Sequence, residues 1–211
     1  MSDTTITAQT IIDQSLSRAK DLDKTNDRLD DSQMLIYMNK SLALAHGMLV
    51  QYNSNIVKNS GTITLTASTQ EYLLSGNLDD FWKIADNEVY AGTTDPLTAI
   101  TREDKIRAGT GTTDDAPSCY YITDTHIGVV PIPSTTGAAA YPTLYCTYYT
   151  KSPVLSLDDK MPYKNILNDS VSMLMDSIAA TATETGSEEF TSFYNAFEEN
   201  IMSIIIAREG L

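Results

Sequence analysis

The chain has few of the residues on which most enzyme chemistry depends. Its 211 residues include two histidines, two cysteines and one tryptophan. Neither His46 nor His126 has a nearby cysteine, a Ser-Gly elbow or an HExxH partner, which disfavours a catalytic base or a pair of metal ligands. Cys119 and Cys146 lack a CxxC or Cys/His spacing, so we favour buried free thiols over a disulfide or a metal site. We predict no enzyme activity, no cofactor and no metal.

Positive charge is scarce as well. The sequence has 14 lysines and arginines against 28 aspartates and glutamates, and its net charge is −14. Such a chain repels phosphate and anionic lipid, which argues against sequence-specific nucleic-acid binding and against a basic membrane patch. It also lacks an 18-residue apolar run and a basic, apolar leader. We therefore expect neither a membrane span nor a signal peptide.

Segments that superficially match binding motifs are better explained as solvated surface. The loop with Gly109 and Gly111 lacks the GK[ST] ending of a phosphate cradle. The acidic connector from Asp21 to Asp27 lacks the glycine and the distal glutamate of an EF-hand. Adjacent acidic pairs, such as Asp158-Asp159 and Glu198-Glu199, rarely converge on one substrate, so a solvated face is favoured over acid-base chemistry.

The N-terminal part of the chain predicts a helix pair. The apolar content, 42%, is that of a folded protein, and the length favours a single domain over residues 1–211. Apolar residues recur at helical spacing from Thr7 to Leu22. A second amphipathic helix is expected to begin after Asp30, which forms a capping box with Gln33. Residues 1–56 are thus predicted to form two helices.

Helical spacing returns near the C-terminus. After Pro162 one face carries Leu167, Val171, Leu174, Ile178 and Ala182. A break at Gly186 is followed by a last apolar helix that runs from Phe190 to Ile205. The short connection favours an antiparallel pair, so residues 161–211 are predicted to form a helical hairpin and a C-terminal tail.

Between the helices, over residues 57–160, hydrophobic residues recur at every second position, as they do in β-strands. The segment Thr62–Thr66 alternates strictly, and Cys119–Ile122 and Ile127–Val130 flank a short turn, as in a hairpin. Other extended segments are predicted at Glu71–Leu74, Phe81–Tyr90, Leu97–Ile100 and Tyr141–Thr150, with a short helix at Arg102–Ala108 and a loop at Thr135–Ala140. We predict an α+β fold in which the terminal helices form a helical bundle and a central antiparallel β segment is inserted.

Tyrosine is abundant, with twelve residues. Six of them fall in the later β segment: Tyr120, Tyr121, Tyr141, Tyr145, Tyr148 and Tyr149. Consecutive residues of a strand point to opposite faces, so one face can enter the core while the other meets a partner. Because tyrosine is common at interfaces, we predict Tyr145, Tyr148 and Tyr149 as interface residues. Ordinary β packing with a few exposed rings is the alternative.

Several segments match a known family. They are the helices Thr7–Ile12 and Met34–Leu42, the segments Ala67–Leu74 and Pro117–Tyr121, Ile127–Pro133, Tyr145–Tyr149 with Pro153, and the final Phe190–Phe197. Through these segments, which span nearly the whole chain, the sequence resembles the small head-tail adaptor, or connector, proteins of tailed bacteriophages, particularly those of short-tailed phages. The family tends to have a proline after the Tyr-Leu-Leu element, where this chain has Ser75-Gly76.

The resemblance implies a non-enzymatic structural protein of the virion. Such adaptors assemble into a ring, typically of twelve copies, beneath the portal protein, and they join the portal to a tail or nozzle protein. Their central channel lets DNA pass without specific binding. The implied location is the virion neck, with assembly in the host cytoplasm and no membrane partner. Related adaptors use a C-terminal segment to dock on the portal, which implies contacts at Ile204, Ile205, Ile206 and Arg208, although the isoleucines also fit a helical core.

Two rival functions follow from the same residues. One is another neck or tail-completion structural protein. The other is a hydrolase or glycan-binding β module, which predicts a concave pocket with converging carboxylates or aromatic rings. The adaptor hypothesis also gives the excess of acids a function, since negative charge along a channel would let DNA slide without sticking. A solvated outer surface is the alternative place for these acids.

Overall fold

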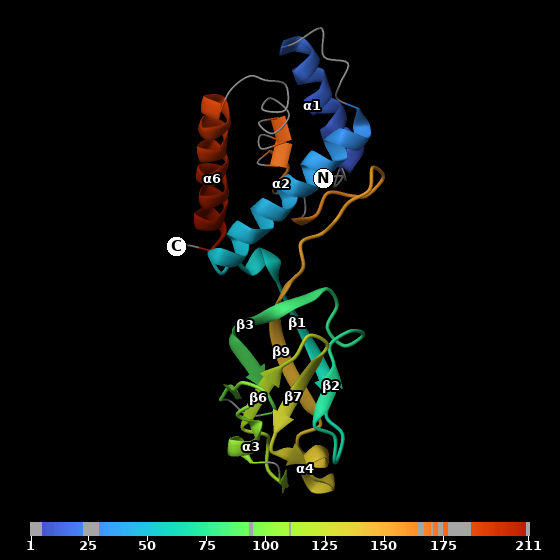
Figure 1. The fold of residues 1–211 in the computed structure, drawn as a ribbon, viewed down its shortest axis with the longest axis vertical. Helices are drawn as coiled ribbons and strands as arrows, with labels where there is room; N and C mark the ends of the chain where they lie inside the picture. The colour runs from blue at the N-terminus through green and yellow to red at the C-terminus, as the bar shows by residue number, and fades with distance from the viewer. Residues whose placement is uncertain are drawn as a thin grey trace. The chain divides into compact units, whose positions relative to one another are not determined.

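The structure, a computed structural model, shows two compact units formed by one chain (Figure 1). It describes residues 6–22, 30–92, 95–109, 111–163, 167–169, 171–172, 175–176 and 187–209. We call residues 1–56 with 152–211 the helical unit and residues 57–151 the β unit. That both units act as one adaptor domain stays a prediction.

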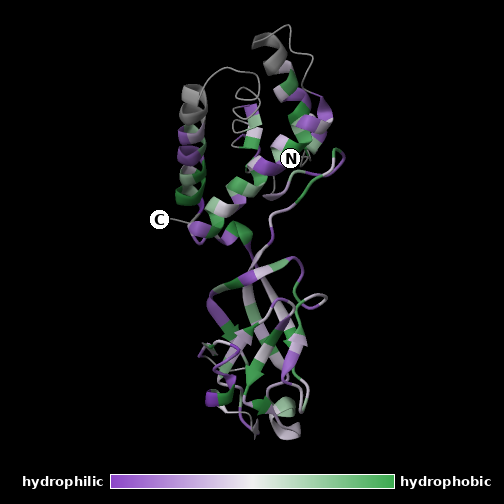
Figure 2. Ribbon diagram, in the orientation of Figure 1, coloured by the Kyte–Doolittle hydropathy of each residue, from purple (hydrophilic) through white to green (hydrophobic). Residues whose placement is uncertain are grey.

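The helical unit contains three long helices among its described residues. They are α1 (Ala8–Leu22), α2 (Asp31–Gln51) and α6 (Ser187–Glu209), and a 3-10 turn, η1 (Asn55–Val57), follows α2. The side chain of Asp30 caps α2 by accepting a hydrogen bond from the Gln33 backbone N–H at 2.8 Å. The buried face of α2 includes Met34, Met38 and Leu42. Figure 2 shows hydrophobic and hydrophilic residues alternating along α2 and α6, as in helices with one buried face.

The predicted terminal helical bundle is wrong. The described residues form a mixed α+β fold whose elements are mostly strands, nine of them in three sheets, and its long helices are too few to form the predicted bundle. The segment 152–163 also contacts α2. The Asn39 amide donates to the Leu155 carbonyl at 3.0 Å and accepts from the Leu155 N–H at 2.8 Å. These bonds join a side chain to the backbone and leave no apolar period in the sequence, which is why the hydrophobic pattern missed them.

The predicted C-terminal hairpin is described only in part. Its second helix is α6, and in its first segment residues 168–169, 171–172 and 175–176 are helical. Leu167 and Val171 are buried. Leu174, Ile178, Ala182 and Gly186 lie outside the described residues, as do Asp23 and Asp27 of the acidic connector.

The β unit contains the three sheets. The first sheet is antiparallel with the strand order β1 (Lys58–Thr64), β9 (Thr143–Thr150), β3 (Phe81–Tyr90). The second sheet has the order β2 (Glu71–Leu73), β7 (His126–Val130), β6 (Cys119–Ile122), β4 (Thr98–Ala99), and the third joins β5 (Thr112–Thr113) to β8 (Ile132–Pro133). The pairs β4–β6 and β5–β8 are parallel, so the β segment is not purely antiparallel as predicted.

Two short helices complete the β unit, α3 (Lys105–Ala108) and α4 (Thr135–Ala140). The segment 135–140 is predicted as a loop from its composition, and this prediction is wrong. The Ser134 hydroxyl accepts a hydrogen bond from the Gly137 N–H at 3.0 Å and caps the helix, and three alanines then favour helix over loop.

The core of the β unit lies between the first and second sheets. The first sheet contributes Ile63, Val89, Leu144, Cys146 and Tyr148, and the second contributes Tyr72, Tyr120, Ile127 and Val129. Hydrophobic residues follow β7 in Figure 2. Because this core takes up one face of the first sheet, the other face of that sheet is not part of it.

Candidate functional site

The face of the first sheet that points away from the core is the candidate interaction surface. Along β9, Leu144, Cys146 and Tyr148 are buried in the core, so Tyr145 and Thr147 point the other way. Cross-strand partners share a face, and the partners of Tyr145 and Thr147 are Thr62, Tyr90 and Ser60. We call the set Ser60, Thr62, Tyr90, Tyr145 and Thr147, with Lys58, Lys83 and Tyr149 in the next row, the outer sheet face.

A shallow hollow of about 360 Å³ lies on this face. Its lining consists of Ser60, Gly61, Thr62, Tyr90, Tyr145, Cys146 and Thr147. Tyr145 is 51% exposed, whereas the hollow contains hydroxyl groups and no carboxylate. The converging carboxylates that a hydrolase requires are therefore not found in this hollow. Tyrosine and threonine side chains suit contact with another protein surface, because they combine apolar area with a hydrogen-bonding group.

Two lysines cover the tyrosine at one end of the face. The ammonium groups of Lys58 and Lys83 lie 5.8 and 5.2 Å from the centre of the Tyr149 ring. Tyr149 is accordingly buried although it points away from the core. Lys58 also forms an ion pair with Asp86 at 2.8 Å. Burial alone would lower the pKa of Lys58, but the hydrogen bond and charge of Asp86 outweigh burial and raise this pKa.

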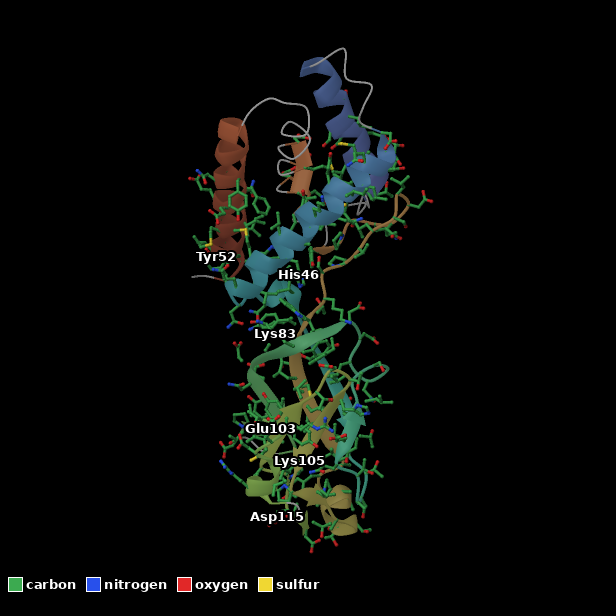
Figure 3. The ribbon with its side chains drawn as sticks, in the orientation of Figure 1. His46, Tyr52, Lys83, Glu103, Lys105 and Asp115 are labelled. Carbon is green, nitrogen blue, oxygen red and sulfur yellow. The ribbon has the colours of Figure 1, made fainter. Side chains whose placement is uncertain are left out.

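A bulge in β3 sets the position of the single tryptophan. Phe81 pairs with Thr150 and Lys83 pairs with Tyr149, so Trp82 is one residue more than the partner strand can match. Trp82 is 48% exposed, and the Lys83 ammonium lies 5.2 Å from its ring centre. A second irregularity follows between Ile84 and Val89, where Asp86 and Asn87 have positive φ values of 49° and 58°. Figure 3 shows Lys83 beside β3.

The second sheet holds a different cluster, centred on Tyr121. The Tyr121 hydroxyl donates to Glu71 Oε1 at 2.8 Å, and the ring lies across Gly128, where a β-carbon would overlap it. Lys105 of α3 lies 5.6 Å from the ring centre, and Arg102 lies 3.8 Å from Glu71. Burial, followed by the hydrogen bond to Glu71, raises the pKa of Tyr121 to about 12. This side chain joins β6, β7 and β2.

The predicted interface residues fall in two separate places. In the β unit, Tyr145 is half exposed, whereas Tyr148 and Tyr149 are buried. On α6, Ile205 is fully buried in line with Phe197 and Ile201, Ile204 is partly buried, and Ile206 and Arg208 are exposed. The two groups belong to different units. Their contact with partners stays a prediction.

Each histidine has a hydroxyl group within hydrogen-bonding distance, and both cysteines are free thiols. The ring nitrogen Nδ1 of His46 lies 2.7 Å from the Tyr163 hydroxyl, and Nδ1 of His126 lies 2.8 Å from the Thr125 hydroxyl. Both cysteines are free, and burial raises the pKa of Cys146 to about 12, which disfavours a reactive thiolate.

The structure was also searched for metal sites and membrane helices. Within the described ranges, no three side chains of histidine, cysteine, aspartate or glutamate gather in a way that would hold a metal ion. None of the helices in those ranges combines the length and apolar character that a bilayer crossing requires.

The sheet with an exposed, tyrosine-bearing face and the long helix with exposed residues near its end are surfaces through which a protein can contact other proteins. Residues 6–209 match the family model described as SU10 adaptor protein, and the chain belongs to this family. It is therefore a phage adaptor protein of the virion that contacts other virion components, which confirms the predicted resemblance. Among curated proteins, no sequence matches the chain.

Sequence reasoning missed Trp82 and Lys83 as surface residues. The strand Phe81–Tyr90 is predicted correctly, but a strict alternation over it hides the extra residue of the bulge. The one available signal is that the only tryptophan of the chain is the second residue of a predicted strand and is followed by a lysine.

Proposed function

We propose that this adaptor forms a ring beneath the portal protein and joins the portal to a tail or nozzle protein. By resemblance to related adaptors the ring has about twelve copies, lies in the virion neck and assembles in the host cytoplasm. DNA passes through its central channel without specific binding. The net charge of −14 supports this passage, since carboxylates along a channel repel phosphate.

The observation that carries the proposal is the presence of two different exposed surfaces on one chain. The outer sheet face belongs to the β unit, and Ile206 and Arg208 lie exposed on α6 of the helical unit. A subunit with two different exposed surfaces can contact a neighbouring copy through one and the portal through the other. Head-to-tail contacts between copies form a ring when the rotation from one copy to the next closes. The end of α6 is the proposed portal contact, with Ile206 and Arg208 as its exposed members and Ile204 beside them.

The proposal is tested by mixing the purified chain with purified portal and imaging the particles by electron microscopy. The expected result is a closed ring of adaptor copies bound coaxially to one side of the portal. Portal particles without such a ring, at adaptor concentrations well above the portal concentration, would refute the proposal. The rival, another neck or tail-completion protein, predicts binding to the assembled neck but not to the portal alone.

A further inference from the structure

The outer sheet face differs in charge from the chain as a whole. The chain has twice as many acidic as basic residues. In contrast, Ser60, Thr62, Tyr90, Tyr145 and Thr147 are uncharged, and the next row of the face adds two lysines. The carboxylates that act on this row, Asp86 and Glu88, lie beside Lys58. The face is therefore neutral on a strongly acidic molecule.

Lys83 is the cation of this face that is available to a partner. Its ammonium contacts the rings of Tyr149 and Trp82, each at 5.2 Å from the ring centre. Over the ranges that the structure describes, no ion pair joins Lys83 to a carboxylate, whereas Lys58 is paired with Asp86. The Lys83 side chain is exposed, so an incoming carboxylate can reach its ammonium group.

Tyr145 on this face and Trp82, whose ring the Lys83 ammonium contacts, both expose apolar area. Trp82 is 48% exposed and lies at the bulge in β3. Tyr145 is 51% exposed and lines the hollow. Tryptophan, tyrosine and arginine are the residues that most often dominate binding energy at interfaces. Two half-exposed aromatic rings, with Lys83 next to one of them, are typical of residues that contribute most of the binding energy in a protein interface.

We infer that the outer sheet face, with Trp82 and Lys83, is the surface on which a second copy of this chain docks. In this contact an exposed carboxylate of the second copy pairs with Lys83, and Trp82 and Tyr145 become buried. The inference rests on the proposed ring and assigns one of its subunit contacts.

Charge identifies the second copy as the occupant. Two copies that each carry a net charge of −14 repel one another over most of their surfaces. They approach without this penalty where one copy presents a neutral face with an available cation and the other presents its acidic surface. Because the neutral face meets a different surface of the neighbour, the contact is heterologous, as a closed ring requires.

A cross-linking experiment on the assembled ring tests the contact. Full-length chain is prepared in isotope-labelled and unlabelled form, mixed in equal amounts, assembled on the portal and treated with a zero-length carbodiimide, which joins lysines to nearby carboxylates. Mass spectrometry is expected to find the Lys83 peptide joined to an acidic adaptor peptide of the opposite label. Rings in which Lys83 is joined only to peptides of its own label, or only to portal peptides, would overturn the inference while leaving the proposed function intact. Failure of any ring to form would overturn both.

Charge reversal provides a second readout. Lys83→Glu is expected to lower the yield of rings at least about tenfold, because a glutamate at this position repels the acidic surface of the neighbouring copy. The matched control is Arg107→Glu, which makes the same change of charge at an exposed residue of α3. This helix begins at Lys105, which Figure 3 shows well apart from Lys83. Because Lys83 also covers Tyr149, thermal melting is measured for both variants, and ring yields are compared at a temperature at which both remain folded. Equal ring yields from the two variants would contradict the inference.

Discussion

Tyr121 shows how a single side chain fixes three strands. Its ring crosses Gly128 on β7 and its hydroxyl reaches Glu71 on β2. Gly128→Ala places a methyl group where the ring lies, and we expect it to lower the free energy of unfolding by about 1–3 kcal/mol. Gly111→Ala is the control, because no atom lies within 4 Å of a β-carbon there, and its effect is expected to stay within about 0.5 kcal/mol. Denaturant titration measures both, and equal losses would contradict this packing.

The pKa of the same residue gives a pH-dependent prediction. The ordinary tyrosine pKa is 10.0, whereas burial and Glu71 raise the pKa of Tyr121 to about 12. The unfolded chain then releases this proton at lower pH than the folded chain, so the stabilisation is complete below about pH 10 and is lost as the pH rises through 12. Tyr121→Phe removes one of the groups responsible. We expect the free energy of unfolding to fall less steeply between pH 10 and 12 in this variant, and an identical slope would show that Tyr121 titrates normally.

Also at the scale of residues, the sequence predicts which strand residues share a face but not how deeply each side chain is buried. It places Tyr148 and Tyr149 on opposite faces of a strand, and the structure has Tyr148 in the core and Tyr149 beneath two lysines. Tyr145 and Tyr149 point the same way, yet one is half exposed and the other is buried. The difference in burial depends on Lys58 and Lys83, which lie on strands distant in the sequence. No local sequence pattern around Tyr149 can therefore predict its burial.

At the scale of elements, periodicity predicts most of the helices and strands because each has one buried face. The predicted segment Phe81–Tyr90 matches β3 residue for residue, and the first strand of the predicted hairpin matches β6. The failures have other physical origins. Helix α4 begins at a capping hydroxyl, and the segment 152–163 contacts α2 through hydrogen bonds between the Asn39 side chain and the Leu155 backbone, which a hydrophobic period does not register.

Helix α6 offers a prediction in which neighbouring isoleucines behave differently. Ile205 is fully buried and Ile206 is 50% exposed. We expect Ile205→Ala to lower the free energy of unfolding by about 2–5 kcal/mol, because it leaves a cavity, and Ile206→Ala to change it by less than about 1 kcal/mol. If α6 contacts the portal, Ile206→Ala is expected to weaken binding to purified portal without destabilising the fold. A stable Ile206→Ala variant that binds the portal as tightly as the parent chain would remove this residue from the contact.

At the scale of the whole molecule, acidity and assembly are linked. A chain with net charge −14 resists nonspecific association with DNA and with its own copies. It therefore needs defined neutral surfaces for assembly, and the outer sheet face is one such surface. The same excess of acid that argues against a DNA-binding protein suits a subunit that surrounds passing DNA.

The most direct test of the ring is the electron cryomicroscopy map of the virion neck. The account predicts density for a closed ring of adaptor copies between portal and tail, with the β unit recognisable by its packed sheets. A neck in which this chain is absent, or is present without forming a closed ring, would contradict the account.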